Sequence, residues 1–268
     1  MEKVIEYYSH FDEWGRLDRE PMEFLINLHF IKRYLADSAS VLDNGAGPGK
    51  YAMELAKLGH RVTLSDLTPR LVDIARQKAE EEGVAGQFQG FHVLNATHLE
   101  GIASEAYDAS LMLGPLYHLQ KEGERIAAVR ELHRVTRSGG IVFVAFQSRM
   151  RMAVTSLQHP QFWKPNDSME AIGGFFETGV FNHQDPGRFT GAYYVDVHEI
   201  KPFMEAHGFE SVDLIGSSSI GALLSDEQKQ YWARRGEYDP LIDFLISVAN
   251  DPSILGVSSH LLYIGKRT

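Results

Sequence analysis

Apolar and polar positions alternate with two different periods along the chain. Between residues 41 and 146, short apolar runs are separated by stretches in which apolar residues recur at helical spacing. The runs predict strands at 41–43, 62–65, 91–94, 109–113 and 141–146, and the stretches predict helices at 50–58, 69–82 and 124–137. This alternation of strand and helix is typical of an α/β fold with a doubly wound parallel sheet.

The pattern continues less regularly in the second half of the chain. Apolar runs at 212–215 and 261–264 predict two more strands, and helical patterns occupy 197–206, 225–235 and 239–249. Three segments lie outside the alternation of strands and helices. They are residues 1–40, whose pattern predicts two helices, and the long connections 147–196 and 216–256. Their aromatic content argues against disorder, and connections of this length usually carry function. We therefore expect an N-terminal helical cap and two lid insertions.

The composition of the chain excludes some kinds of site and disfavours some kinds of partner. The chain has 268 residues, of which 44% are hydrophobic, enough for one domain with a single core. It has no cysteine, which excludes disulfides and thiolate metal sites. A formal net charge of −10 disfavours a nucleic acid or an anionic membrane as partner. The lack of an apolar leader or of a bilayer-spanning stretch predicts a cytoplasmic protein.

A glycine-rich turn follows the first predicted strand. The segment Val41-Leu42-Asp43-Asn44-Gly45-Ala46-Gly47-Pro48-Gly49 leads directly into a helical pattern. A strand, a glycine-rich turn and a helix together form the nucleotide-binding unit of α/β folds. The spacing G-x-G-x-G differs from the dinucleotide fingerprint G-x-G-x-x-G, and Pro48 lacks the backbone N–H that a phosphate would use. The carboxylate of Asp43 repels phosphate and suits a cationic ligand.

A second carboxylate stands at the end of the second predicted strand. Asp66 follows Gly49 by seventeen residues. A carboxylate at this place in an α/β fold accepts hydrogen bonds from ribose hydroxyls. Thr68 and Pro69 then provide a cap and a first residue for the next helix. The spacing therefore predicts that Asp66 binds a ribose, the alternative being a capping carboxylate.

Together with the strand ends at 91–96 and 107–113 and the segment 137–144, these motifs give the chain a family resemblance. It resembles the class I S-adenosylmethionine-dependent methyltransferases, most clearly over residues 41–146. The resemblance implies a Rossmann-like, seven-stranded, mostly parallel sheet whose last strand is antiparallel. It also implies S-adenosylmethionine as cofactor and S-adenosylhomocysteine as product. Residues 1–268 would then form one methyltransferase domain around a cofactor-binding core at 41–146.

The resemblance places the cofactor contacts at the carboxyl ends of the first four strands. The implied residues are Asp43, Gly45, Ala46, Gly47, Asp66, Leu67, Asn95, Ala96 and Leu113. The backbone carbonyl of Leu113 would hold the methionine ammonium group. The family usually has an acidic residue facing the adenine amino group, whereas this chain has Asn95. The side-chain carbonyl of Asn95 accepts the same hydrogen bond, although a plain turn residue is the alternative.

The segment 114–118, just after the fourth strand, should lie beside the transferred methyl group. His118 is the candidate base because imidazole titrates near neutral pH, the alternative being a histidine bonded to nearby backbone. Further candidates for the acceptor pocket are Tyr8, Tyr117, His183, Tyr193 and Tyr194. Arg16 is a candidate partner of the cofactor carboxylate or else forms a surface ion pair. The twelve histidines lack H-E-x-x-H spacing, so no metal is expected.

The sequence thus predicts methyl transfer to an oxygen or nitrogen atom of a small molecule: a metabolite, a natural product or a short peptide. Enzymes that methylate base amines carry a side-chain acceptor after the fourth strand, which Gly114-Pro115-Leu116-Tyr117 lacks. A non-catalytic cofactor-binding protein and a protein methyltransferase are the alternatives, while Asp43 and Pro48 disfavour a dehydrogenase. The helix predicted at 239–249 packs either on the sheet of a monomer or on a second subunit in a homodimer.

Overall fold

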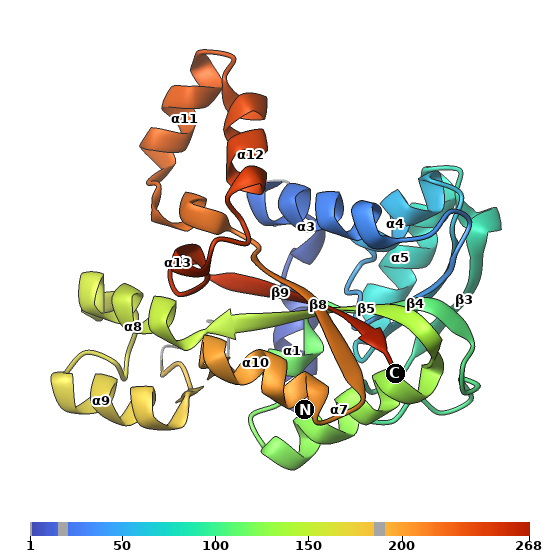
Figure 1. Ribbon diagram of the computed structural model, residues 1–268, viewed down its shortest axis with the longest axis horizontal. Helices are drawn as coiled ribbons and strands as arrows, with labels where there is room; N and C mark the ends of the chain where they lie inside the picture. Colours follow the sequence, from blue (N-terminus) through green and yellow to red (C-terminus); the bar gives the residue numbers. More distant parts are fainter. Residues whose placement is uncertain (1, 16–20, 185–190) are drawn as a thin grey trace.

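A computed structural model describes residues 2–15, 21–184 and 191–268 of the chain (Figure 1). Seven strands form its main sheet: β1 (Ser40–Asn44), β2 (Arg61–Asp66), β3 (Phe88–Val93), β4 (Tyr107–Met112), β5 (Thr136–Ser148), β8 (Phe209–Gly216) and β9 (His260–Arg267). Their order is β3-β2-β1-β4-β5-β9-β8, and β9 runs antiparallel to both of its neighbours. The predicted seven-stranded sheet with an antiparallel last strand is therefore confirmed.

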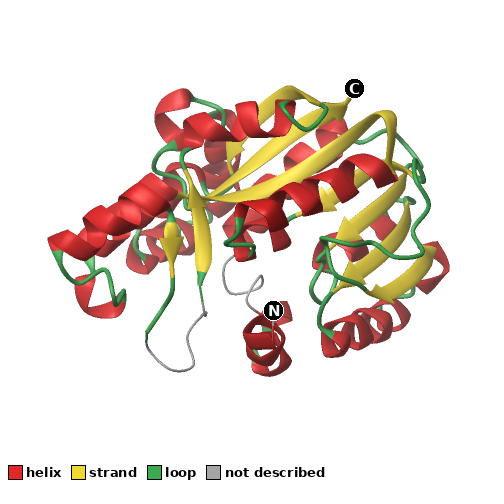
Figure 2. Ribbon diagram, turned by 90° about the horizontal axis from the view of Figure 1, so that it is seen from below, coloured by secondary structure: helices red, strands yellow, loops and turns green. Residues whose placement is uncertain are grey.

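Helices cover both faces of this sheet (Figures 1 and 2). One face carries α3 (Pro21–Tyr34), α4 (Lys50–Lys57), α5 (Pro69–Glu81) and α12 (Tyr238–Ser247), and the other carries α7 (Glu122–Val135) and α10 (Val197–Glu205). Neighbouring residues of β4 enter opposite layers, Leu111 the first and Met112 the second. Because both faces are buried, the strands read as continuous apolar runs. The α12 side chains Ile242 and Leu245 join the first layer, which agrees with packing on the sheet.

Some element bounds differ from the predicted ones. Strand β5 begins at Thr136, directly after α7, because it pairs with β4 from this residue on. The Thr136 hydroxyl donates a hydrogen bond to the hydroxyl of Ser110 in β4. Strand β3 begins at Phe88, after the short 3₁₀ helix η1 (Ala85–Gln87), and not at 91. Helix α1 (Glu2–His10) ends before Phe11. Residues 13–15 are helical again, and Asp12 Oδ1 accepts the N–H of Gly15 as a capping side chain does.

The two long insertions lie on the side of the molecule opposite to β3 in Figure 1. The first contains α8 (Arg149–Gln158), η2 (Pro160–Phe162), α9 (Met169–Thr178), β6 (Val180–Phe181) and β7 (Ala192–Val195); the second contains η3 (Ser219–Leu223), α11 (Asp226–Arg234), α12 and α13 (Pro252–Leu255). Strand β7 pairs with the end of β5 and with β6, which adds two short strands that the sequence pattern did not predict. Within the described ranges, no helix combines the length and apolar character needed to cross a bilayer.

Candidate active site

A cavity of about 360 Å³ lies at the carboxyl ends of β1, β2, β3 and β4. Its walls include twelve of the residues predicted from the sequence: Asp43, Gly45, Ala46, Gly47, Asp66, Leu67, Asn95, Ala96, Leu113, Tyr8, Tyr117 and His118. Strand β1 is flanked by β2 on one side and β4 on the other, so the chain reverses its winding direction here. Such a switch point is where open α/β sheets bind ligands.

The glycine turn after β1 has a shape that only glycine allows at its first position. Gly45 adopts a φ of +71°, and a Cβ atom there would collide with the ring of Pro115 in the loop after β4. The backbone N–H groups of Gly45 and Ala46 both donate to the carbonyl of Ser65, at 2.8 and 3.0 Å. The turn therefore packs closely against two neighbouring strand ends and forms a firm floor for the cavity.

Asp66 ties the same turn to the end of β2. Its Oδ2 accepts the N–H of Gly47 and its Oδ1 accepts the N–H of Thr68, both at 2.8 Å. Burial raises the pKa of Asp66, while these two hydrogen bonds oppose the rise. A carboxylate has about four acceptor positions, so these two bonds and a further one from the Thr68 hydroxyl leave room for a hydrogen bond from a ribose hydroxyl.

Asp43 lies beneath the turn and is only 1% exposed. Burial, and then repulsion from Asp66, raises the pKa of Asp43 to about 7, against a hydrogen bond from the backbone of Ala52. Its Oδ2 is buried and accepts no hydrogen bond from the residues that the structure describes. The raised pKa brings the titration of Asp43 close to neutral pH, so the negative charge expected from the sequence depends on the pH and on what lies in the cavity. A cation in the cavity would restore its charge.

Asn95 lines the cavity from the loop after β3. Its Oδ1 accepts the N–H of Thr97 at 3.0 Å, which closes an Asx turn. The turn role considered for Asn95 is therefore confirmed. A carbonyl oxygen has two lone pairs, so an Asx turn does not by itself exclude a hydrogen bond from a ligand.

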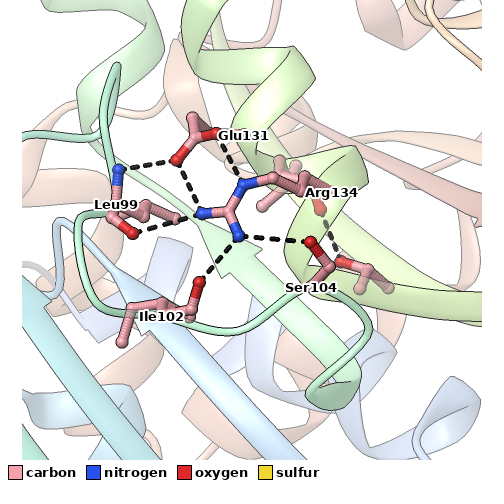
Figure 3. Close-up of polar contacts among 7 residues, drawn as sticks. Leu99, Ile102, Ser104, Glu131 and Arg134 are labelled. Carbon is pink, nitrogen blue, oxygen red and sulfur yellow. Dashed lines mark hydrogen bonds and ion pairs between the residues drawn. The ribbon is translucent and has the colours of Figure 1, made fainter.

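A polar network on α7 holds this loop in place (Figure 3). Arg134 donates to the carbonyls of Leu99 and Ile102, at 3.1 and 2.7 Å, and pairs with Glu131 at 2.8 Å. Glu131 Oε2 in turn accepts the N–H of Leu99 at 2.6 Å. The hydrogen bond from Arg134 lowers the pKa of Glu131, so the pair is charged near neutral pH. The network fixes the loop that brings Asn95 to the cavity.

The loop after β4 brings His118 to the opposite wall, at the end of the short helix α6 (Pro115–His118). His118 Nε2 lies 3.2 Å from the hydroxyl of Tyr8 in α1, although the two residues are 110 positions apart. Burial lowers the pKa of His118 to about 4, so the imidazole is neutral near neutral pH. The neighbouring Tyr117 hydroxyl donates to the carbonyl of Leu113 at 3.4 Å. Three predicted acceptor-side residues thus meet at one wall.

The structure does not bring the other three predicted aromatic residues to this cavity. The His183 ring packs near Trp163 and Phe181, and Tyr194 is buried in the same insertion against Phe175 and Phe181, where burial raises its pKa. Tyr193 lines a second cavity of about 320 Å³, where the Arg125 guanidinium carbon lies 3.6 Å from its ring centre. The insertion buries its aromatic rings against one another to form a core of its own.

Neither insertion contributes a described residue to the wall of the first cavity. The predicted role of 147–196 and 216–256 as a lid therefore stays a prediction. Arg16 lies outside the described residues. In the described part of the chain, no three histidine or acidic side chains are grouped so that they could hold a metal ion.

Eight wall residues were not singled out from the sequence: Val4, Glu13, Glu23, Lys50, Tyr51, Leu119, Lys121 and Glu124. Lys50 and Tyr51 follow the glycine turn directly, so their position could have indicated them. Glu13 and Glu23 come from the N-terminal cap, which has no recognisable motif. The carboxylates of the wall outnumber its lysines, which favours a cationic ligand.

Comparison with known proteins agrees with this geometry. Residues 41–140 match the family model described as a methyltransferase domain. The chain is 31% identical over 131 residues to a ubiquinone biosynthesis O-methyltransferase of Methylocella silvestris, covering 47% of this chain and 48% of that protein. It is 33% identical over 111 residues to a tRNA 5-carboxymethoxyuridine methyltransferase of Escherichia coli, covering 40% and 39%. The chain thus spans less than half the length of these curated relatives.

A solved structure shares the fold over the whole chain. It is the 1,6-didemethyltoxoflavin-N1-methyltransferase of Burkholderia thailandensis with bound 1,6-didemethyltoxoflavin and S-adenosylhomocysteine. The two share 16% sequence identity with a TM-score of 0.58, over 100% of this chain and 86% of the other. The strand order and the glycine turn with its two carboxylates agree with these matches: residues 41–140 are similar to a methyltransferase domain, and the chain shares the fold of a methyltransferase of known structure.

Proposed function

We propose that this protein transfers the methyl group of S-adenosylmethionine to an oxygen or nitrogen atom of a small molecule held in the first cavity. The observation that carries the proposal is the convergence of Asp43, Asp66 and the glycine turn at the switch point of the sheet. S-adenosylmethionine, when bound, supplies an electrophilic methyl group on a sulfonium centre.

The residues of the cavity fit this cofactor. Asp66 would accept the ribose hydroxyls, and Asn95 and Ala96 would contact the adenine. Asp43 and the carbonyl of Leu113 would favour the positive charge of the methionine part. An excess of carboxylates and a turn that lacks one N–H at Pro48 do not suit a pyrophosphate.

Tyr8, Tyr117 and His118 form the wall assigned to the methyl acceptor. The neutral His118 imidazole can accept a proton or hydrogen-bond the acceptor atom, and the Tyr8 hydroxyl fixes its ring. A pKa of about 4 makes His118 a weak base, so holding the acceptor in line is the larger contribution. Such positioning supplies roughly 7–11 kcal/mol in well-oriented reactions.

The size and the charge of the site favour a small acceptor. The cavity is about 360 Å³ and is bounded in part by the N-terminal helices. One relative is named for a tRNA substrate. A net charge of −10 disfavours that class for this chain, because binding to RNA is dominated by phosphate contacts.

The test supplies S-adenosylmethionine labelled on its methyl group, together with a host cell extract separated by size. We expect label in the small-molecule fraction for the wild-type protein and none for a boiled sample. Label only in RNA or protein would overturn the small-molecule acceptor. Cofactor binding without transfer of label to any fraction would identify a non-catalytic binding protein.

A further inference from the structure

Glu23 is one of the carboxylates of the cavity wall that have no part in the function proposed above. Glu23 lies in the first turn of α3 and lines the cavity. Its Oε2 is 3.2 Å from Nδ1 of His260, the first residue of β9. Both side chains are mostly buried, with 18% of Glu23 and 21% of His260 exposed. This contact joins the N-terminal cap to the first residue of β9, at the end of the sheet where the cavity lies.

His260 is held from its other side by the sheet. Gln147 of β5 is its direct partner in the antiparallel ladder, so the two side chains leave the same face. Gln147 Nε2 lies 3.2 Å from His260 Nε2, and the ring of Tyr117 lies 5.8 Å from the His260 ring. In a neutral ring, an Nε2 that accepts from the Gln147 amide leaves the proton on Nδ1, where it faces the carboxylate of Glu23.

A neutral imidazole donates to a carboxylate without cancelling its charge. Among the residues that the structure describes, no lysine or arginine lies within ion-pair distance of Glu23. A cation that approaches a largely buried carboxylate gains a charge-assisted hydrogen bond from it. The cavity that Glu23 lines is where such a cation can approach.

We propose that Glu23, oriented by His260 and Gln147, forms a subsite for an ammonium group inside the cavity. The proposal rests on the proposed function, because two bound molecules can bring such a group there. One source is the methionine part of the cofactor, and the other is an amine on the methyl acceptor. In both cases a charge-assisted hydrogen bond from N–H⁺ to the carboxylate provides the recognition.

The first experiment compares Glu23→Gln with the wild-type protein and with the control Glu54→Gln, which changes a carboxylate of α4 that pairs with Lys57 and does not line the cavity. S-adenosylhomocysteine and 5′-methylthioadenosine are titrated separately by calorimetry, since only the former carries the amino-acid part. If the cofactor occupies the subsite, Glu23→Gln weakens S-adenosylhomocysteine about tenfold and leaves methylthioadenosine unchanged.

If the acceptor occupies the subsite, both titrations stay as in the wild type. Accepting activity in the host extract then binds to a cation exchanger, and Glu23→Gln lowers transfer of label to that fraction about tenfold. Wild-type binding and wild-type transfer in Glu23→Gln would overturn the proposal. Equal weakening of both ligands would also overturn it, because it would show a general disturbance of the site.

A second pair of variants tests the orienting role of His260. His260→Asn keeps an N–H donor near the position of Nδ1, whereas His260→Phe removes the donor and keeps a ring against Tyr117. We expect His260→Phe to reproduce the loss seen in Glu23→Gln and His260→Asn to retain most of the wild-type value. Equal behaviour of the two variants would overturn the orienting role. A wild-type protein that neither binds S-adenosylhomocysteine nor transfers label would instead contradict the proposed function.

Discussion

Replacing Asp43 by asparagine should stabilise the protein while weakening its cofactor site. The pKa of Asp43 rises from 3.8 to about 7 on folding, since the carboxylate is buried next to Asp66. At about 1.4 kcal/mol per pKa unit, keeping this group ionised costs the folded state about 4 kcal/mol. Asp43→Asn removes that charge at nearly constant volume.

The raised pKa of Asp43 determines how the stability of the folded protein changes with pH. The folded protein binds a proton at Asp43 more tightly than the unfolded chain does, so this contribution to stability is present at low pH. It is lost as the pH rises through the folded pKa of about 7. Between about pH 5.5 and about pH 8.5, the wild type should lose about 2 kcal/mol more unfolding free energy than Asp43→Asn.

Urea unfolding of both proteins across this pH range measures the difference, because the other titrating groups are common to both. Calorimetry in two buffers of different ionisation enthalpy adds a second readout. S-adenosylmethionine should release about half a proton from the wild type at neutral pH and none from Asp43→Asn, which should also bind it more weakly. The reasoning would be refuted by the same pH dependence of stability in both proteins.

The remaining predictions concern other residues that line the cavity or support its loops. Asp66→Asn should cost about 2–4 kcal/mol of affinity for S-adenosylhomocysteine by calorimetry, and unchanged affinity would refute the ribose assignment. Glu131→Gln should speed hydrogen exchange of backbone amides in 95–104 and lower stability by about 1–2 kcal/mol, whereas unchanged exchange would show that Arg134 needs no anionic partner. His118→Gln and Tyr8→Phe should leave cofactor affinity unchanged and lower transfer of label about tenfold, and full transfer would remove both residues from the acceptor site.

The half of the cavity that we propose for the cofactor was predictable because local sequence determines it. The turn 43–49 needs glycine where φ is positive, and Asp66 stands at a fixed distance after it. Parallel strands place their carboxyl ends at one edge, so residues at strand ends meet whatever their separation in the chain. The strand pattern was equally readable, since strands buried on both faces are apolar throughout.

The acceptor half was not predictable to the same degree. Glu23 reaches the cavity because α3 packs on the sheet, and no local pattern encodes that contact. His183 and Tyr194 were selected as aromatic residues in a long insertion, but such residues fill a small core as readily as they line a pocket. The pKa of Asp43 also depends on burial among residues distant in sequence, so its charge could not be inferred from residue type.

The central claim is that the cavity at the strand ends binds S-adenosylmethionine and not a dinucleotide. Calorimetric titration of the wild-type protein with S-adenosylmethionine and, separately, with NAD tests it most directly. The account predicts saturable binding of one S-adenosylmethionine per chain and no measurable heat with NAD. Tighter binding of NAD, or no binding of S-adenosylmethionine, would contradict it.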